Sequence, residues 1–186
     1  MNLAFYNGTV LQTLYVSGNR TQDLEWYAQK VAYKMGLNTT AANVARPINP
    51  QDYALTSEDM PGFEPGVFQF RNASGMDDAP LQMGWKTGFT AQYSNASLEV
   101  IQFISIYPRE NISKVFNVSK LGENESLVQT PTYGEWSAAF SFVDDEGMPG
   151  MNLVFYNGTV LETLYVSSNN TSDLEWYAQR TVSKRG

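Results

Sequence analysis

The stretch FYNGTVLQTLYVSGNRTQDLEWYAQ, residues 5–29, recurs almost unchanged as FYNGTVLETLYVSSNNTSDLEWYAQ, residues 155–179. The longer segments Met1–Lys34 and Met151–Lys184 differ at nine positions, so 25 of their 34 residues are identical. A near-copy displaced by 150 residues predicts a tandem repeat with a unit of that length. We therefore expect residues 1–150 to form one β-rich repeat unit and residues 151–186 to begin a second copy. Because Met1 aligns with the internal Met151, we also interpret the chain as a segment of a longer repetitive protein.

Inside the repeated stretch, the apolar pattern is typical of β-structure. LQTLYVS (11–17) alternates between its two faces, which predicts a half-buried strand. DLEWYAQ (23–29) follows a Gly/Asn-rich turn and predicts the second strand of a hairpin, while NLAFYN (2–7) predicts a third strand. A helix over Asp23–Met35 is the alternative, but the aromatic and β-branched content favours the strand.

The rest of the chain repeats this pattern and sets the fold class. Further strands are predicted at 67–72, 83–93, 98–107, 113–119 and 135–144, and the proline-rich residues 43–65 predict a long ordered loop. The sequence therefore predicts an all-β fold of antiparallel sheets made from repeated hairpins, arranged as a β-sandwich or a propeller.

Composition excludes several classes of function. Hydrophobic residues make up 42% of the chain, which is enough for a core, and charged residues only 17%, against about 25% in ordinary domains. The net charge of −7 argues against a nucleic-acid partner. The absence of Cys and His excludes disulfides, thiol chemistry, a Ser-His-Asp triad and most transition-metal sites. No run is long and apolar enough for a transmembrane segment. We expect no cofactor and no metal.

The strongest functional signal is the N-glycosylation acceptor motif Asn-X-Ser/Thr, or sequon. Ser and Thr total 29 of 186 residues, so chance would place roughly 2 of the 15 asparagines in sequons under this pattern. The chain instead carries 11, which predicts a heavily N-glycosylated protein that is secreted or displayed at a cell surface. The acceptors are Asn7, Asn19, Asn38, Asn72, Asn95, Asn111, Asn117, Asn124, Asn157, Asn169 and Asn170.

Two further kinds of site are left open by the residues. Tyr and Trp beside polar side chains are typical of carbohydrate-binding surfaces. The candidates are Tyr15, Trp26 and Tyr27, their repeats Tyr165, Trp176 and Tyr177, and also Trp85 and Trp136. Packing of the tryptophans in the core is the alternative. The carboxylates at Asp77–Asp78 and Asp144–Glu146 could hydrolyse a glycoside, although adjacent acids in turns are more often solvated loop residues.

The hairpin TLYVSGNRTQDLEWYAQ (13–29) resembles a blade of the fungal and bacterial fucose-binding lectins, which are six-bladed β-propellers. GWKTGF (84–89) resembles the closing strand of such a blade, and FISIYPRENISKVFN (103–117) resembles the hairpin more loosely. The resemblance implies three blades of about 50 residues in each 150-residue unit. It implies Glu25 and Trp26, and Glu175 and Trp176 in the repeat, as sugar contacts. Thr13, and Thr163 in the repeat, stand where the family has its sugar-clamping Arg.

These observations favour a non-catalytic structural or adhesive extracellular glycoprotein, built from repeats that associate with one another and form a matrix, filament or cell-surface layer. A β-propeller lectin with a carbohydrate ligand is the second hypothesis. A carboxylate-dependent glycoside hydrolase is the third.

Overall fold

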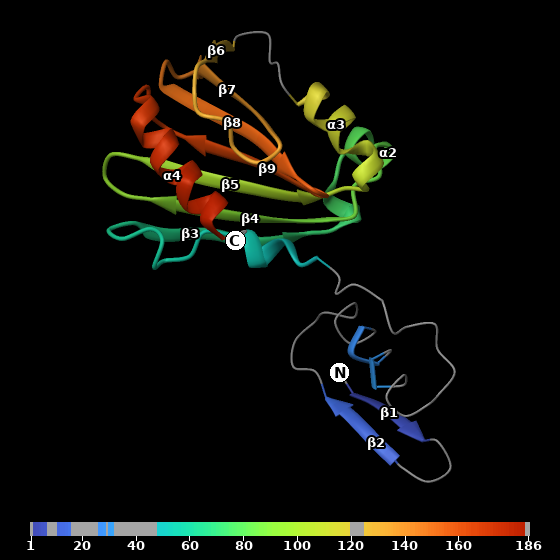
Figure 1. The fold of residues 1–186 in the computed structure, drawn as a ribbon. Coiled ribbons are helices and arrows are strands. Elements are labelled where there is room, and N and C mark those ends of the chain that lie inside the picture. The colour runs from blue at the N-terminus through green and yellow to red at the C-terminus, as the bar shows by residue number, and fades with distance from the viewer. Residues whose placement is uncertain are drawn as a thin grey trace. The chain divides into compact units, whose positions relative to one another are not determined.

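The computed structural model describes residues 2–6, 11–15, 26–28, 30–31, 48–119 and 125–184. It divides the chain into two compact units, Met1–Ile48 and Asn49–Gly186 (Figure 1). In the described part of the chain, no helix is long and apolar enough to cross a membrane.

The first unit contains an antiparallel hairpin of β1 (Asn2–Tyr6) and β2 (Leu11–Tyr15). Both strands were predicted from their alternating pattern, and both are confirmed. Residues 26–28, 30 and 31 are helical. The strand predicted over DLEWYAQ is therefore wrong at its described residues, and the alternative helix is the better prediction.

The second unit is mostly β and is built on one open antiparallel sheet, in the order β3-β4-β5-β9-β8-β7-β6 (Figure 1). A sandwich needs two packed sheets and a propeller several small sheets around an axis, so neither predicted architecture is observed in this unit. The strands are β3 (Glu64–Arg71), β4 (Thr87–Ser94), β5 (Glu99–Ile106), β6 (Ser126–Val128), β7 (Trp136–Val143), β8 (Pro149–Asn157) and β9 (Val160–Val166).

The second copy of the repeated stretch supplies the middle of this sheet. β9 pairs with β5 on one side, β8 pairs with β7 on the other, and β8 and β9 pair with each other. The segment from Met151 onward lies in the same compact unit as the residues before it, Asn49–Gly186. It completes the sheet formed by residues before it, so the folded unit and the 150-residue period are out of phase.

Each face of the sheet carries its own hydrophobic cluster because successive side chains of a strand point to opposite faces. Met151, Leu153 and Phe155 of β8 join the cluster beneath helix α4 (Thr171–Ser183). Val154 and Tyr156, between and after them, join the cluster beneath helix α3 (Arg109–Val118). The hairpin is thus covered by a helix on both sides, as Figure 1 shows for α4 on one face.

α4 forms where a strand was predicted, and its burial pattern gives the reason. Leu174, Tyr177, Ala178 and Thr181 are the buried residues, at the i, i+3, i+4, i+7 spacing of one helical face. Asn170 caps the helix by accepting a hydrogen bond from the backbone of Ser172 at 3.1 Å. The two-residue alternation seen in DLEWYAQ was therefore accidental.

The strand predicted at 113–119 is also wrong, because helix α3 covers most of these residues. Its buried residues Ile112, Val115 and Phe116 follow helical spacing, and Pro108 precedes its first turn. The prediction relied on the preference of the segment's β-branched residues for strands, rather than on the helical spacing of its apolar residues. The strands predicted at 67–72, 98–107 and 135–144 are confirmed within one to three residues, and β4 covers the second half of 83–93.

Short helical elements complete the unit: η2 (Pro50–Tyr53), η3 (Ala73–Gly75) and α2 (Asp78–Gln82). η2 lies inside the region 43–65 that was predicted as a loop, and β3 begins at the end of that region. A buried polar pair connects η2 and the loop after it to the sheet. Gln102 of β5 donates to Glu162 of β9 at 2.9 Å and to the Tyr53 carbonyl at 3.1 Å, and it accepts from the Leu55 backbone at 2.8 Å.

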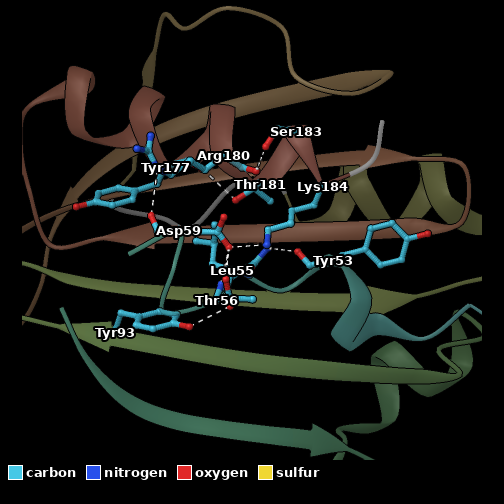
Figure 2. Close-up of polar contacts among 11 residues, drawn as sticks. Tyr53, Leu55, Thr56, Asp59, Tyr93, Tyr177, Arg180, Thr181, Ser183 and Lys184 are labelled. Atoms are coloured by element: carbon cyan, nitrogen blue, oxygen red, sulfur yellow. Dashed lines mark hydrogen bonds and ion pairs between the residues drawn. The ribbon is translucent and has the colours of Figure 1, made fainter. Parts of the chain in front are cut away.

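A polar clamp fastens the loop around Asp59 to the last turn of α4 (Figure 2). The Lys184 ammonium lies 2.5 Å from the Asp59 carboxylate, which also accepts from the Thr56 backbone and hydroxyl at 2.7 Å. The Arg180 guanidinium donates to the Asp59 carbonyl at 3.1 Å. The end of the unit is therefore held beside its first residues.

This clamp predicts an acid-sensitive contribution to stability. Burial raises the pKa of Asp59, but hydrogen bonds from Lys184 and Thr56 outweigh burial and leave the pKa below its ordinary value of 3.8. The stabilisation is fully present above the unfolded-state pKa of about 4 and is lost as pH falls through the folded-state pKa. We expect Asp59→Asn to cost about 0.5–1 kcal/mol at pH 7 and little near pH 2. Urea unfolding at several pH values measures this, with Glu58→Gln in the same loop as the control. Equal costs at pH 7 and pH 2 would contradict it.

Candidate functional site

Most sequon asparagines in the second unit are exposed. The exposed ones are Asn72, Asn95, Asn117, Asn157, Asn169 and Asn170, whereas Asn111 is half-buried. The other four acceptors, Asn7, Asn19, Asn38 and Asn124, lie outside the described residues. Exposure is what attachment of a glycan requires, so six of the seven described acceptors are accessible.

Three of these asparagines also have a local structural role. Asn72 accepts from the Ser74 backbone at 3.1 Å, and Asn95 accepts from two backbone groups of its turn at 2.8 and 2.9 Å. Asn170 caps α4. Turn formation explains these three without a glycan. Each of these hydrogen bonds uses the Oδ1 atom, however, and the glycan is linked through Nδ2, so both roles are compatible on one side chain.

Asn111 differs because its Nδ2 atom is engaged. In the first turn of α3, this nitrogen donates to the Met83 carbonyl at 3.0 Å. A Cβ atom added at the neighbouring Gly84 would lie only 3.1 Å from the same nitrogen, which shows how closely this turn approaches. A sugar on Asn111 would break the hydrogen bond and meet the Met83–Gly84 turn. Asn117, at the exposed end of the same helix, has room for a glycan.

Five of the six exposed acceptors lie at the ends of the strands, and the sixth, Asn117, lies near the end of α3. The β4–β5 turn carries Asn95, and Asn169 and Asn170 follow β9 at the same end, where the Ser167 backbone donates to the Glu99 carbonyl at 2.9 Å. Asn72 follows β3 and Asn157 ends β8 at the opposite end of the sheet. Glycans at these positions would cover the two ends of the sheet and leave its lateral edges open.

The turn at Asn157 is fixed by an exposed ion pair. The Arg109 guanidinium donates to the Glu135 carboxylate at 2.6 and 2.8 Å. Glu135 also accepts from the backbone N–H of Gly158 at 2.8 Å, and Arg109 donates to the Gly158 carbonyl at 2.9 Å. These hydrogen bonds, led by that from Arg109, lower the pKa of Glu135. Gly158 adopts φ +61°, a conformation that favours glycine. The acceptor therefore lies beside a defined turn.

A small aromatic groove lies at the start of α4. It has a volume of about 420 Å³ and is lined by Pro61, Phe63, Ser172, Asp173, Trp176 and Tyr177. The ring of Tyr177 is buried and meets the ring of Phe63 edge-on at 5.9 Å between centroids. Asp173 accepts from the Ser168 hydroxyl at 2.7 Å and contributes, after burial, to the raised pKa of Tyr177. The groove combines apolar ring surface with a carboxylate.

Two predicted binding residues reach this groove, the buried Tyr177 and the partly exposed Trp176. Trp176 offers the accessible ring. One face of its ring is covered by Arg180, whose guanidinium carbon lies 3.1 Å from the ring centroid. This stacking fixes the indole while leaving part of it exposed, which suits a sugar contact. Sequence reasoning missed Pro61 and Phe63 because they come from a proline-rich segment more than 100 residues away.

The other predicted binding residues are not brought together. Tyr165 lies on the opposite face of the sheet, because its neighbours Leu164 and Val166 join the cluster beneath α4, and it stacks with Phe142 at 5.9 Å. Glu175 is half-buried and contributes, after burial, to the raised pKa of Tyr133. Trp26 lies in the first unit, and the side chains of Tyr15 and Glu25 lie outside the described residues.

The carboxylates considered for hydrolysis are parts of turns. Asp144 accepts from the backbone of Glu146 at 3.0 Å and of Met148 at 2.8 Å. Asp77 precedes α2 at its N-cap position and is exposed. Across residues 48–119 and 125–184, no three Asp or Glu side chains gather into a group that could hold a metal ion.

Comparison with known proteins gives little further guidance. No protein-family model and no curated protein matches the chain. The crystal structure of the extracellular domain of PknH from Mycobacterium tuberculosis is similar over 74% of this chain and 91% of that chain, with a TM-score of 0.49 and 10% sequence identity. A likeness this distant identifies neither a family nor a ligand.

Proposed function

We propose that this protein is a non-catalytic, N-glycosylated structural or adhesive component of an extracellular surface or matrix. The observation that carries the proposal is the excess of sequons together with the exposure of six of the seven that the structure describes. Random Asn-X-Ser/Thr motifs would number roughly 2, by the acceptor pattern, so chance does not account for the excess. Low charge and the absence of Cys and His favour the same class.

The distribution of apolar surface supports a role in contact with neighbouring copies. Val67, Phe68 and Phe70 are half exposed on the edge strand β3, and Leu127 and Trp136 are exposed on β6 and β7 near the other edge. Edge strands with exposed apolar side chains favour pairing with another chain. Glycans at the strand ends would leave these edges free, so the unit would associate laterally with further copies of itself.

Glycopeptide mass spectrometry of the native protein tests the proposal. We expect N-linked glycans at Asn72, Asn95, Asn117, Asn157 and at one of the adjacent Asn169 and Asn170. Asn111 is expected to be unmodified, because its Nδ2 atom is bonded to the Met83 carbonyl. Asn117 in the same helix is the internal control. An unglycosylated native protein would contradict the proposal, and uniform occupancy that includes Asn111 would contradict the structural reason given for it.

A carbohydrate-binding function is the second candidate, favoured by the groove at Trp176. An indole held by a stacked Arg180, next to the Asp173 carboxylate, offers ring surface and a hydrogen-bond acceptor together. Such grooves suit the apolar face and the hydroxyl groups of a sugar ring. This site lies next to the acceptor Asn170, whose side chain accepts from the backbone of the groove residue Ser172, and it does not depend on a propeller fold.

A glycan array followed by titration of the hits distinguishes the two functions. If the groove binds sugar, Trp176→Ala should weaken binding by about five- to thirtyfold, since loss of an aromatic stacking contact costs on the order of 1–2 kcal/mol. Trp136→Ala removes an exposed indole on β7 and should leave binding unchanged. The absence of any hit, or equal losses in both variants, would eliminate the groove as a sugar site.

A further inference from the structure

The first unit reproduces the backbone of the hairpin in the centre of the second unit. β1 and β2 pair with Leu3 opposite Leu14, and β8 and β9 pair with Leu153 opposite Leu164. All five residue pairs of the first hairpin match pairs of the second after a shift of 150 residues. Sequence identity and strand register therefore agree.

The helix that follows the hairpin is reproduced as well. Trp26 and Tyr27 meet edge-on at 4.7 Å and 77°, and Trp176 and Tyr177 do so at 4.7 Å and 83°. A cation lies over each indole, Lys30 at 5.7 Å in the first copy and Arg180 at 3.1 Å in the second. Met1–Lys34 and Met151–Lys184 are thus two copies of one hairpin–helix module.

The two copies differ in what surrounds them. The second is inserted between β5 and β7, whereas in the described residues of the first unit β1 and β2 pair only with each other. Tyr177 is 5% exposed because Phe63 and the groove residues pack on it, but the matching Tyr27 is 39% exposed. Phe63 and Pro61 belong to the segment 49–148, which supplies the slot for the module and is here called the scaffold.

Three of the four differences between the copies at buried positions are compatible with the same slot. The fourth replaces Ser168, whose hydroxyl donates to Asp173, by Gly18, which loses that bond. Glu162 accepts from Gln102, and Gln12 in the first copy carries an amide oxygen that can accept the same bond. The hydroxyl of Thr181 bonds only within its own helix, to the Tyr177 carbonyl, so the similarly shaped Val31 loses little. Val154 is replaced by the smaller Ala4, which fits without a clash.

We propose that Met1–Lys34 is an interchangeable hairpin–helix module that inserts between strands of the β5 and β7 type in a second copy of this domain. The partner is a copy of the scaffold whose own slot is vacant, so that its β5 and β7 edges are open, and it also offers a surface like that of Phe63 over the helix. This inference goes beyond the proposed function, since it concerns assembly of the sheet and holds whether or not the asparagines carry glycans.

The geometry of the second unit allows the exchange to be tested within one full-length chain. Its last helix is clamped to Asp59, close to the first residues of the scaffold. The 14 residues 35–48 join the first module to the scaffold and can span up to about 45–50 Å when extended. If the second module is disabled, the first can therefore reach the vacated slot of its own chain, which stands in for the second copy.

The experiment compares four full-length proteins by near-UV circular dichroism and thermal unfolding. They are the wild type, Leu153→Asp/Leu164→Asp, Leu3→Asp/Leu14→Asp, and the protein with all four substitutions. Leu153 and Leu164 are fully buried, so two carboxylates there should expel the second module. We expect that variant to keep a native-like aromatic signal and a cooperative transition at a lower temperature, because the first module replaces the second.

The remaining variants make the result decisive. Leu3→Asp/Leu14→Asp should leave the transition of the second unit unchanged, and the fourfold variant should lose it. If Leu153→Asp/Leu164→Asp unfolds as completely as the fourfold variant, the first module does not fit the slot and the proposal fails. It also fails if the fourfold variant retains the signal, because the rescue would then not come from Met1–Lys34.

Discussion

Two backbone ladders, β5 with β9 and β7 with β8, hold the second unit together, and both depend on the same hairpin. Without β8 and β9 the sheet would separate into β3-β4-β5 and β6-β7. The side chains add to this dependence. Leu153, Phe155, Leu164 and Leu174 are fully buried, and burial of a side chain of this size contributes about 2 kcal/mol. The helix that follows the hairpin forms one wall of the aromatic groove and anchors the clamp at Asp59.

The surface of the unit divides into regions of different character around this core. Turns at the two ends of the strands carry five of the six exposed acceptor asparagines, Asn117 lies near the end of α3, and the lateral edges carry exposed apolar side chains. The groove at Trp176 lies at the start of α4, next to the acceptor Asn170. A unit glycosylated as proposed would keep open edges for assembly, and a module that inserts into another copy of the sheet would add a specific connection between copies.

The sequence predicted the strands well where alternation was supported by β-branched residues, as in β5 with VIQFISI. It failed at α3 and α4, where Val, Ile, Tyr and Trp on a helical period were interpreted as strands. The acceptor asparagines could be found from a motif of three residues, because the motif is local. The groove could not, since Phe63 and Trp176 meet only after the sheet has formed. The position of the folded unit within the repeat could not be predicted either. The hairpin's partners on its two sides, β5 and β7, are not repeated in the sequence.

The dependence of the sheet on its central hairpin is the main claim, and native-state hydrogen exchange in low concentrations of urea measures it most directly. Amides of β8 and β9 should exchange only by global unfolding, with the same free energy and urea dependence as those of β5. The edge strand β3 should exchange earlier, through local opening. If β8 and β9 exchanged through a smaller opening while β4 and β5 stayed protected, the hairpin would be an addition to the sheet rather than its centre, and the account would be contradicted.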